Sequence, residues 1–300
     1  MQSTGIITKQ KIRDYYYVTK PNVISLLVFT GSAAYVASAG WHTSFVTLVV
    51  VVVSIWLGSA AANTVGSYFD RDLDMVMSRT RYRPIPTGKI IPYNAAIYGI
   101  GLLAASIFLS AFFLSWMSAV AMVVGFSDYT IVYSYLTKRR TPLNIVLGGF
   151  SGVMPILVGY FATKNPVIPL ATAIFIGFLV FFWIPEHIWS LAVRYKQDYR
   201  DAKVPMLPAV VSENTSIRVI AITSIVMVIY SLAPVVFQQF FLHSIYTVTA
   251  SILGATVLAF NVWLLRKPSA ERAWTVFKFS SPYLFFIFIA IMADALVYSR

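Results

Sequence analysis

Long apolar runs recur along the whole chain and alternate with short polar segments. A helix that crosses the hydrocarbon core of a bilayer needs about 20 apolar residues, and nine runs approach that length. The spans that we predict are 22–40, 45–67, 92–113, 115–136, 143–162, 167–188, 217–237, 243–265 and 274–297. The third and fourth runs almost touch, so we expect a short turn near Ser115 to separate them.

The composition agrees with a protein whose solvent is the bilayer. Hydrophobic residues make up 58% of the chain and charged residues only 11%, with a mean hydropathy of +0.75. About a quarter of an ordinary soluble domain is charged. We therefore predict an all-α fold, a polytopic membrane helical bundle of about nine transmembrane helices, forming one domain over residues 1–300. The chain contains no cysteine, which excludes disulfides and thiolate metal sites.

Basic residues gather on one side of the predicted bundle. The N-terminal segment 1–20 and the four connections on its side hold nearly all of the 23 Lys and Arg residues, and only Lys164 and Arg300 fall on the other side. Cytoplasmic loops carry an excess of Lys and Arg, so we predict a multi-pass cell-membrane protein with a cytoplasmic N-terminus and an extracytoplasmic C-terminus. The net charge of +12 then reflects topology and contact with membrane lipid, and we expect no nucleic-acid partner. Two cytoplasmic connections, 68–91 and 186–216, are long and polar, and we expect function to lie there.

The first long connection carries a cluster of carboxylates. Residues 56–77 continue a helical pattern beyond the membrane, and a helical phase of 100° per residue puts Asp70 and Asp74 on one face. Asn63 lies two turns earlier on nearly the same face, whereas Asp72 points away. Two converging carboxylates suit Mg²⁺, which proteins hold through one or two carboxylates together with substrate phosphates. A solvated loop with local ion pairs explains the same charges equally well.

A second acidic site tips this balance. The stretch "RYKQDYRDAKVPMLP" places Asp198 and Asp201 three residues apart, just after the sixth predicted span. Four spans separate this site from the first, so both sites face the same side of the membrane. Paired acidic sites at one face of a bundle fit an allylic diphosphate held by Mg²⁺ above a cavity that excludes water.

Four stretches resemble one known family. "YFDRDLDMVMSRTRYRPIPTG" resembles the first aspartate-rich signature of the UbiA superfamily of intramembrane prenyltransferases, whose fold is a helical bundle around a central cavity. "VYSYLTKRRTPLNIVLGGFSGVMPILVGY", "WIPEHIWSLA" and "DYRDAKVPMLPAV" follow in the family's order. The histidine and V-P-M-L-P stretches resemble the heme O synthase branch, which farnesylates protoheme. The resemblance covers residues from about 60 to 210.

The resemblance implies roles for individual residues. It implies that Asp70, Asp74 and Asp198 serve as catalytic residues and hold Mg²⁺ and diphosphate, while His187 contacts heme. Basic and polar residues are expected on the diphosphate, on heme propionates or along the cavity: Asn63, Arg71, Arg79, Arg83, Lys138, Arg139, Asn144, Arg194 and Lys196. Asp201 has no clear counterpart in the family motif and is a candidate only from its spacing to Asp198. The expected substrates are heme B and an isoprenyl diphosphate, farnesyl by family habit. Mg²⁺ is the expected cofactor, and the branch allows contact with heme A synthase or a terminal oxidase assembly.

The chain departs from the family pattern at three places. Gly66 or Ser67 stands where the family usually carries asparagine, and Asn63, one turn earlier, is the substitute that we expect. Glu186 replaces the second proline before the histidine, and Lys203 replaces the glycine of A-G-V-P. None of these changes removes an aspartate on which the prediction depends.

Two other functions fit part of the pattern. A sister prenyltransferase of the superfamily, acting on a quinone precursor or an archaeal lipid glycerol, needs the same first site but lacks the P-x-H-x-W and V-P-M-L-P stretches. A transporter needs charges along a path through the membrane. Asp128 is a carboxylate in the middle of a predicted span, and both a functional role and a hydrogen bond within the bundle remain open for it.

Overall fold

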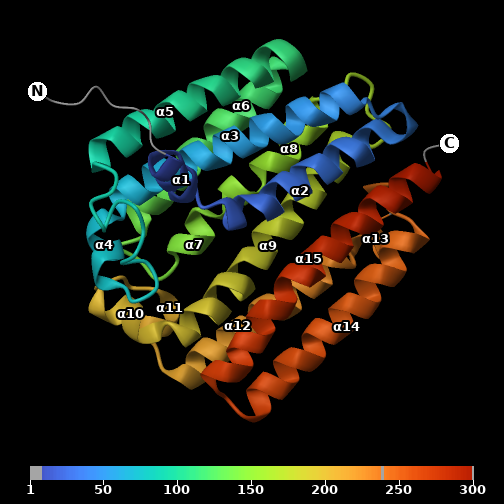
Figure 1. The fold of residues 1–300 in the computed structure, drawn as a ribbon. Helices are drawn as coiled ribbons and strands as arrows, with labels where there is room; N and C mark the ends of the chain where they lie inside the picture. Colours follow the sequence, from blue (N-terminus) through green and yellow to red (C-terminus); the bar gives the residue numbers. More distant parts are fainter. Residues whose placement is uncertain (1–8, 238–239, 299–300) are drawn as a thin grey trace, which may run out of the picture.

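The computed structural model describes residues 9–237 and 240–298, and every regular element within these ranges is a helix (Figure 1). Eight helices are long and apolar enough to cross a membrane. They are α2 (Pro21–Ala39), α3 (Phe45–Phe69), α5 (Pro92–Leu109), α6 (Trp116–Ser127), α9 (Leu170–Arg194), α12 (Glu213–Ser231), α14 (Ser244–Arg266) and α15 (Ala270–Tyr298). The segments η2 (Ser110–Leu114) and η3 (Asp128–Thr137) continue α5 and α6 as π-helix. The extended backbone of Ser115, at φ −159°, confirms the predicted turn between these two crossings.

The fifth predicted span is a broken helix. The chain forms α7 (Asn144–Leu147), the 3-10 turn η4 (Gly149–Gly152) and α8 (Met154–Phe161) in place of one continuous helix. Glycines and Pro155 explain the break, because glycine favours irregular backbone and proline removes a helical hydrogen bond. With this segment the described residues form nine crossings, eight of them continuous. At membrane depth, irregular backbone is tolerated where it is covered by protein or lines a cavity.

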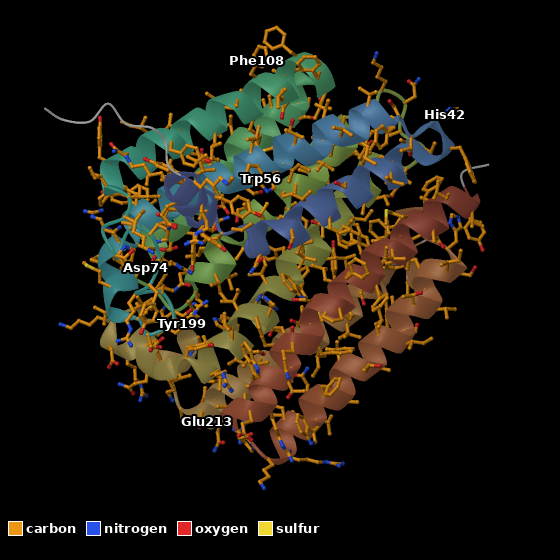
Figure 2. All side chains as sticks on the ribbon, viewed as in Figure 1. His42, Trp56, Asp74, Phe108, Tyr199 and Glu213 are labelled. Atoms are coloured by element: carbon orange, nitrogen blue, oxygen red, sulfur yellow. The ribbon has the colours of Figure 1, made fainter. Side chains whose placement is uncertain are left out.

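Short helices gather at one end of the bundle, which we call the polar end. It is formed by α1 (Lys9–Val18), α4 (Arg71–Val76), α10 (Lys196–Asp201) and α11 (Leu207–Val210). Val18 of α1 packs against Ile85 and Ile90, in the connection that follows α4. Figure 2 shows Asp74 and Tyr199 toward this end and His42 at the opposite one.

The helix α9 enters the polar end further than the sequence predicted. It continues to Arg194, so Glu186 and His187 lie inside a membrane-spanning helix and the connection to the next crossing starts only after residue 194. At the far end, the indole nitrogen of Trp41 donates to the carbonyl of Leu296 at 2.8 Å. Both α2 and α15 therefore end at the far end. The chain enters its first crossing from the polar end and leaves its last crossing at the far end, as an odd number of crossings requires.

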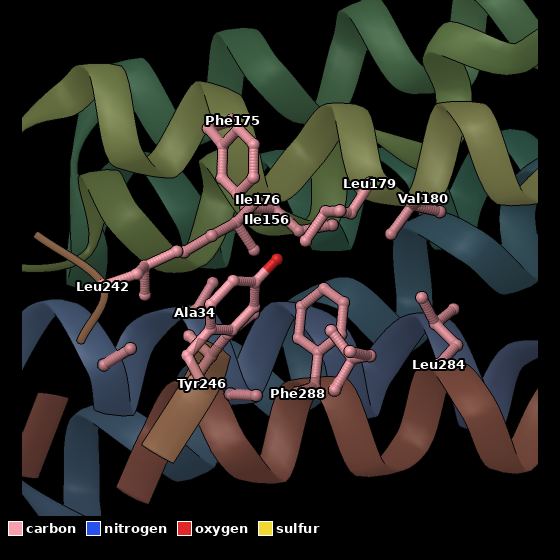
Figure 3. Packing of buried hydrophobic residues seen from close by; sticks show 14 of the residues in the cluster. Ala34, Ile156, Phe175, Ile176, Leu179, Val180, Leu242, Tyr246, Leu284 and Phe288 are labelled. Atoms are coloured by element: carbon pink, nitrogen blue, oxygen red, sulfur yellow. The ribbon is translucent and has the colours of Figure 1, made fainter. Parts of the chain in front are cut away.

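The largest apolar core lies where α2, α8, α9 and α15 meet. Phe175 and Ile176 of α9 face Tyr246 of α14 and Phe288 of α15 across this core (Figure 3). Backbones come unusually close between α2 and α8, because a side chain on Gly159 would lie 2.1 Å from the carbonyl oxygen of Gly31. Small residues at such crossings let membrane helices pack by van der Waals contact. This packing holds the broken helix in place beside the site described next.

Candidate active site

The first acidic cluster forms where α3 passes into α4. Asp70 sits at the junction and Asp74 one turn later, and the two residues are 3% and 4% exposed. Asp72, between them, points to solvent, with 54% of its side chain exposed. The predicted helical phase is therefore confirmed for all three aspartates. Because buried carboxylates need compensating charge, the basic partners of Asp70 and Asp74 define the site.

Lys138 neutralises Asp70. The Nζ of Lys138 lies 2.6 Å from Oδ2 of Asp70, and both side chains are largely buried. Burial alone lowers the pKa of Lys138, but the Asp70 carboxylate and Tyr133 outweigh that effect and raise it well above its ordinary value. Oδ1 of Asp70 is buried and has no hydrogen-bond partner. This free oxygen is available to a ligand that enters the site.

Arg83 neutralises Asp74, and Lys20 adds a further cation. One guanidinium nitrogen of Arg83 lies 3.0 Å from each carboxylate oxygen of Asp74. Lys20 lines a small pocket with these two residues and Ser67, held by a left-handed backbone with φ +58°. Burial and the charge of Arg83 lower the pKa of Lys20 to about 7. Our sequence prediction missed Lys20 because it lies some fifty residues before the aspartates.

Two predicted basic residues lie outside this buried group. Arg139 forms a two-point ion pair with exposed Asp72, at 2.6 and 2.7 Å, which lowers the pKa of Asp72. Arg71 is exposed, donates to the carbonyl of Tyr68 at 2.8 Å and stacks on its ring. The phase that turns Asp72 away from the site also carries Arg71 to the outer surface, and Arg139 is held there by Asp72.

The second acidic site lies beside the first. Oγ of Ser78 donates to Asp198 at 2.8 Å, across 120 residues of sequence. Asp201 is exposed and accepts from Gln197 at 2.7 Å on the same short helix, so it does not reach the cluster. The prediction that the two aspartate-rich connections share one end of the bundle is confirmed through Asp198.

The replacement of a family glycine by Lys203 is accommodated by local backbone. Lys203 keeps the left-handed conformation, with φ +54°, that glycine adopts without strain. Its amide donates to the carbonyl of Arg200 at 3.0 Å, and that of Val204 to Tyr199 at 2.9 Å. These two bonds form a Schellman motif that ends α10. The turn that positions the second acidic site is therefore intact.

A largely apolar cavity of about 280 Å³ lies between α2, α3, α6, the broken helix and α9. Gly148, Ser151 and Pro155 of the broken helix line it, which gives a physical reason for the break. Asn63 and Tyr133 lie at the end of the cavity nearest the acidic cluster. An apolar cavity that ends at a cluster of charges suits a ligand with an apolar body and a charged head.

Aromatic rings form the boundary between the cavity and the charges. Tyr129 and Tyr133 project from the π-helical segment η3, with ring centroids 5.6 Å apart. The hydroxyl of Tyr129 donates to Oδ1 of Asn63 at 3.4 Å, and Nζ of Lys138 lies 5.4 Å from the Tyr133 ring centroid. A side chain on Gly66 would meet the Tyr129 ring at 2.8 Å. The Tyr129 ring therefore leaves little room for a side chain at residue 66, and the substitution of Asn63 for the family asparagine stays a prediction.

Asp128 has a structural partner. Its Oδ2 accepts from the backbone N–H of Ser151 at 2.7 Å, inside η4 of the broken helix. Such a bond satisfies a donor that the break would otherwise leave unpaired in the membrane. The structure therefore favours a hydrogen bond within the bundle for Asp128.

His187 lies away from the cavity. Its ring stacks on Trp183 at 4.1 Å and lies 4.5 Å from Phe277, and its Nδ1 is 2.6 Å from Oγ of Ser280. The cavity is lined instead by its neighbours Trp183, Ile184 and Ile188. His187 does not line this cavity, because its ring faces α15, and its contact with heme stays a prediction. Glu186 is buried beside it, and its Oε2 has no partner.

The other predicted polar residues surround the polar end of the cavity. Asn144 is fully buried at the start of α7, and its Oδ1 has no partner. Arg79 stacks over Tyr195 at 5.2 Å, Arg194 over Trp274 at 5.0 Å, and Lys196 donates to the carbonyl of Val211. These three cations lie at the polar end of the bundle, and we call them the basic rim.

The donor atoms suit Mg²⁺, but they are not gathered around one point. Within the described ranges, no three acidic or histidine side chains form a group that holds a metal ion. Asp70, Asp74 and Asp198 are instead satisfied separately by Lys138, Arg83 and Ser78. Hard carboxylate oxygens and the free Oδ1 of Asp70 fit Mg²⁺ when a ligand supplies the remaining oxygens. The set of three metal ligands, Asp70, Asp74 and Asp198, stays a prediction.

A family model and full-length relatives identify the chain. The model of the UbiA prenyltransferase family matches residues 26–290. The chain belongs to the UbiA prenyltransferase family. It is 39% identical to protoheme IX farnesyltransferase 2 of Cenarchaeum symbiosum, covering 96% of this chain and 97% of that protein. It is also 39% identical to protoheme IX farnesyltransferase of Thermoplasma volcanium, covering 94% and 97%. The predicted prenyltransferase and its heme O synthase branch are confirmed.

Solved structures confirm the predicted fold. A structure of digeranylgeranylglyceryl phosphate synthase superposes with a TM-score of 0.77 at 19% identity, covering 96% of this chain and 99% of that one. A UbiA homologue of Archaeoglobus fulgidus, bound to DMAPP and Mg²⁺, gives 0.66 at 17% identity, covering 93% and 99%. At these identities the likeness concerns the fold alone.

Proposed function

We propose that this prenyltransferase is a heme O synthase, which transfers a farnesyl group from farnesyl diphosphate to a vinyl group of heme B. The observation that carries the proposal is the junction of an apolar cavity with a buried acidic and basic cluster. Relatives named protoheme IX farnesyltransferase, similar over nearly the whole chain, support the choice of acceptor. We include Mg²⁺ as cofactor, since a family structure carries DMAPP and Mg²⁺ together.

The cluster binds the diphosphate head in this proposal. Mg²⁺ supplies positive charge that favours departure of the diphosphate. Asp70 and Asp74 hold the metal from α3 and α4, and Asp198 does so from α10. Lys138 and Arg83 then turn toward phosphate oxygens, because a ligand that takes over their carboxylate partners releases them, and Lys20 adds its amino group from the same pocket. Their combined charge stabilises diphosphate as it leaves.

The cavity and its tyrosines control the carbon chemistry. As the bond between C1 and oxygen breaks, an allylic cation forms at the level of Tyr129 and Tyr133, whose ring faces attract cations. Vinyl carbon then attacks C1, and water adds to the resulting benzylic-type cation and loses a proton. In total, the heme gains one farnesyl and one hydroxyl group, and diphosphate and a proton are released. The apolar lining keeps water away from C1 until the new bond has formed.

Heme approaches from the polar end. Arg79, Arg194 and Lys196 offer cations for its two propionates at the basic rim. We place this end in the cytoplasm, with the C-terminus outside, from the distribution of basic residues. Heme A synthase or a terminal oxidase assembly is the partner that would receive the product.

The competing functions have less support. A sister prenyltransferase is favoured only by the fold. Digeranylgeranylglyceryl phosphate synthase is 19% identical to this chain, whereas protoheme IX farnesyltransferase 2 is 39% identical. Transport needs ionisable groups along a membrane path. Asp128 bonds to Ser151, and Asp294 accepts backbone N–H groups from His243, Ile245 and Tyr246, where it caps α14. Both carboxylates are thus used within the fold.

The proposal is tested with membranes containing the protein, heme B, farnesyl diphosphate and Mg²⁺. Farnesylated heme is expected from the wild type and from Asp72→Asn, a matched control on the outer face of the same helix. Asp70→Asn is expected to lower the rate at least a hundredfold. Full activity of Asp70→Asn, or loss of activity in Asp72→Asn alone, contradicts the assigned site.

A further inference from the structure

The cavity is closed at its end inside the membrane. Ile55 and Val158 are fully buried there, and Met122 lies beside them. On the side away from the acidic cluster, these three residues join one packed cluster with Tyr35 and Val51. The cavity therefore has a floor, and Asn63, Tyr129 and Tyr133 of its lining lie toward the opposite, charged end.

Met122 forms the adjustable part of this floor. Its sulfur lies 2.0 Å from the position that a side-chain carbon on Gly58 would occupy. The absence of a side chain at Gly58 thus gives Met122 the space that it fills. Since both residues line the cavity, their sizes together fix where an apolar chain must end.

The depth of the cavity matches a chain of three isoprene units. Along α3, Ile55 is eight residues before Asn63, which at 1.5 Å per residue is about 12 Å. Along α6 and η3, Met122 is eleven residues before Tyr133, or about 16 Å. With C–C bonds of about 1.5 Å, an extended farnesyl chain measures about 14 Å, geranyl about 9 Å and geranylgeranyl about 19 Å. Farnesyl fills the depth, geranyl leaves it partly empty, and geranylgeranyl exceeds it.

We propose that Met122, seated against Gly58, sets the isoprenoid length that this enzyme accepts. The inference rests on the proposed function, because the diphosphate must be held at the acidic cluster for the floor to measure the chain. The side chain of Met122 beyond Cβ is about as long as one isoprene unit. Shortening it makes room for the fourth unit of geranylgeranyl diphosphate.

The test measures binding of unreactive substrate analogues. Farnesyl and geranylgeranyl S-thiolodiphosphates are titrated with Mg²⁺ and without heme. Wild-type protein is expected to bind the farnesyl analogue at least tenfold more tightly. Met122→Ala is expected to bring the two affinities within threefold of each other. Met227→Ala is the control, since Met227 is equally buried but belongs to the core between α9 and α15.

A second variant changes the floor in the other direction. Gly58→Ala adds a methyl group where the sulfur of Met122 lies, and with a packed cluster behind it we expect the side chain to move toward the cavity that it lines. Its preference for the geranyl over the farnesyl analogue is expected to rise at least fivefold. An unchanged length preference in Met122→Ala, or an equal change in Met227→Ala, overturns the inference.

The two proposals fail in different ways. If Met122→Ala and Gly58→Ala change the preference for isoprenoid length as expected but the protein does not prenylate heme, heme is not the acceptor and the inference about Met122 stands. Farnesylation of heme with no effect of Met122→Ala on length preference overturns the inference alone. Failure of every analogue to bind contradicts both, because the acidic cluster is then not a diphosphate site.

Discussion

The ion pair between Asp70 and Lys138 allows a quantitative test of how the site is held together. Lys138→Met removes the ammonium and leaves the Asp70 carboxylate buried, with Oδ1 already unpartnered. Removing one partner of a buried pair costs about 3–5 kcal/mol, because the remaining charge has lost its compensation. Asp70→Asn should destabilise by a similar amount, since it leaves the buried ammonium of Lys138 unpaired.

The double variant is expected to recover most of this loss. With both charges removed, neither Asn nor Met leaves a buried ion, so stability should return to within about 2 kcal/mol of the wild type. The coupling energy from the cycle of single and double variants is then at least about 4 kcal/mol, because two single losses of about 3 kcal/mol or more leave a loss of only about 2 kcal/mol in the double variant. Free energies of unfolding come from denaturant titrations of the purified protein in mixed micelles, without added ligand.

A matched cycle on the same helix provides the control. Asp72 and Arg139 form an ion pair of similar length, but 54% and 40% of their side chains are exposed. Exposed pairs contribute about 0–1 kcal/mol, so Asp72→Asn with Arg139→Met should show coupling below 1 kcal/mol. Equal coupling in the two cycles, or additive effects at Asp70 and Lys138, refutes the argument that the buried pair holds the site.

Two further predictions concern Lys20 and Asp128. The folded pKa of Lys20, about 7, lies below its unfolded value of 10.5, so the unfolded chain binds more protons between these values and stability rises with pH. From pH 7 to 9 the wild type should gain about 1–2 kcal/mol relative to Lys20→Met in denaturant titrations; a relative loss contradicts the assigned environment. Asp128→Asn keeps an oxygen acceptor for Ser151, so its rate of heme farnesylation should stay within threefold of the wild type. A hundredfold loss would show that the charge itself is needed.

Local periodicity was enough to predict the parts of this fold that depend on neighbours in sequence. Apolar runs predicted the crossings, and the helical phase separated buried Asp70 and Asp74 from exposed Asp72. The break at 148–155 was missed because the segment is as apolar as an intact span. The glycines and Pro155 permit an irregular backbone there, but the cavity that the segment lines forms only when other helices pack around it.

The contents of the site depended on contacts that sequence spacing does not encode. Lys20 joins Asp74 through a left-handed turn before α2, and Tyr129 reaches Asn63 across 66 residues. A tyrosine in an apolar run, such as Tyr129, is usually interpreted as a residue at the membrane interface. Its neighbours in sequence do not indicate that it lines a cavity. The histidine stretch correctly indicated the heme branch, yet His187 packs on α15 because the rotation of α9 is set by tertiary packing.

The account rests most directly on the identity of the product. Membranes containing the protein receive heme B, equimolar competing acceptors (hydroxybenzoate and glycerol phosphate lipid), farnesyl diphosphate and Mg²⁺, and the extracts are analysed by mass. The account predicts heme whose mass has increased by one farnesyl and one hydroxyl group, absent when farnesyl diphosphate is omitted. Unmodified heme beside a prenylated hydroxybenzoate or lipid would contradict it.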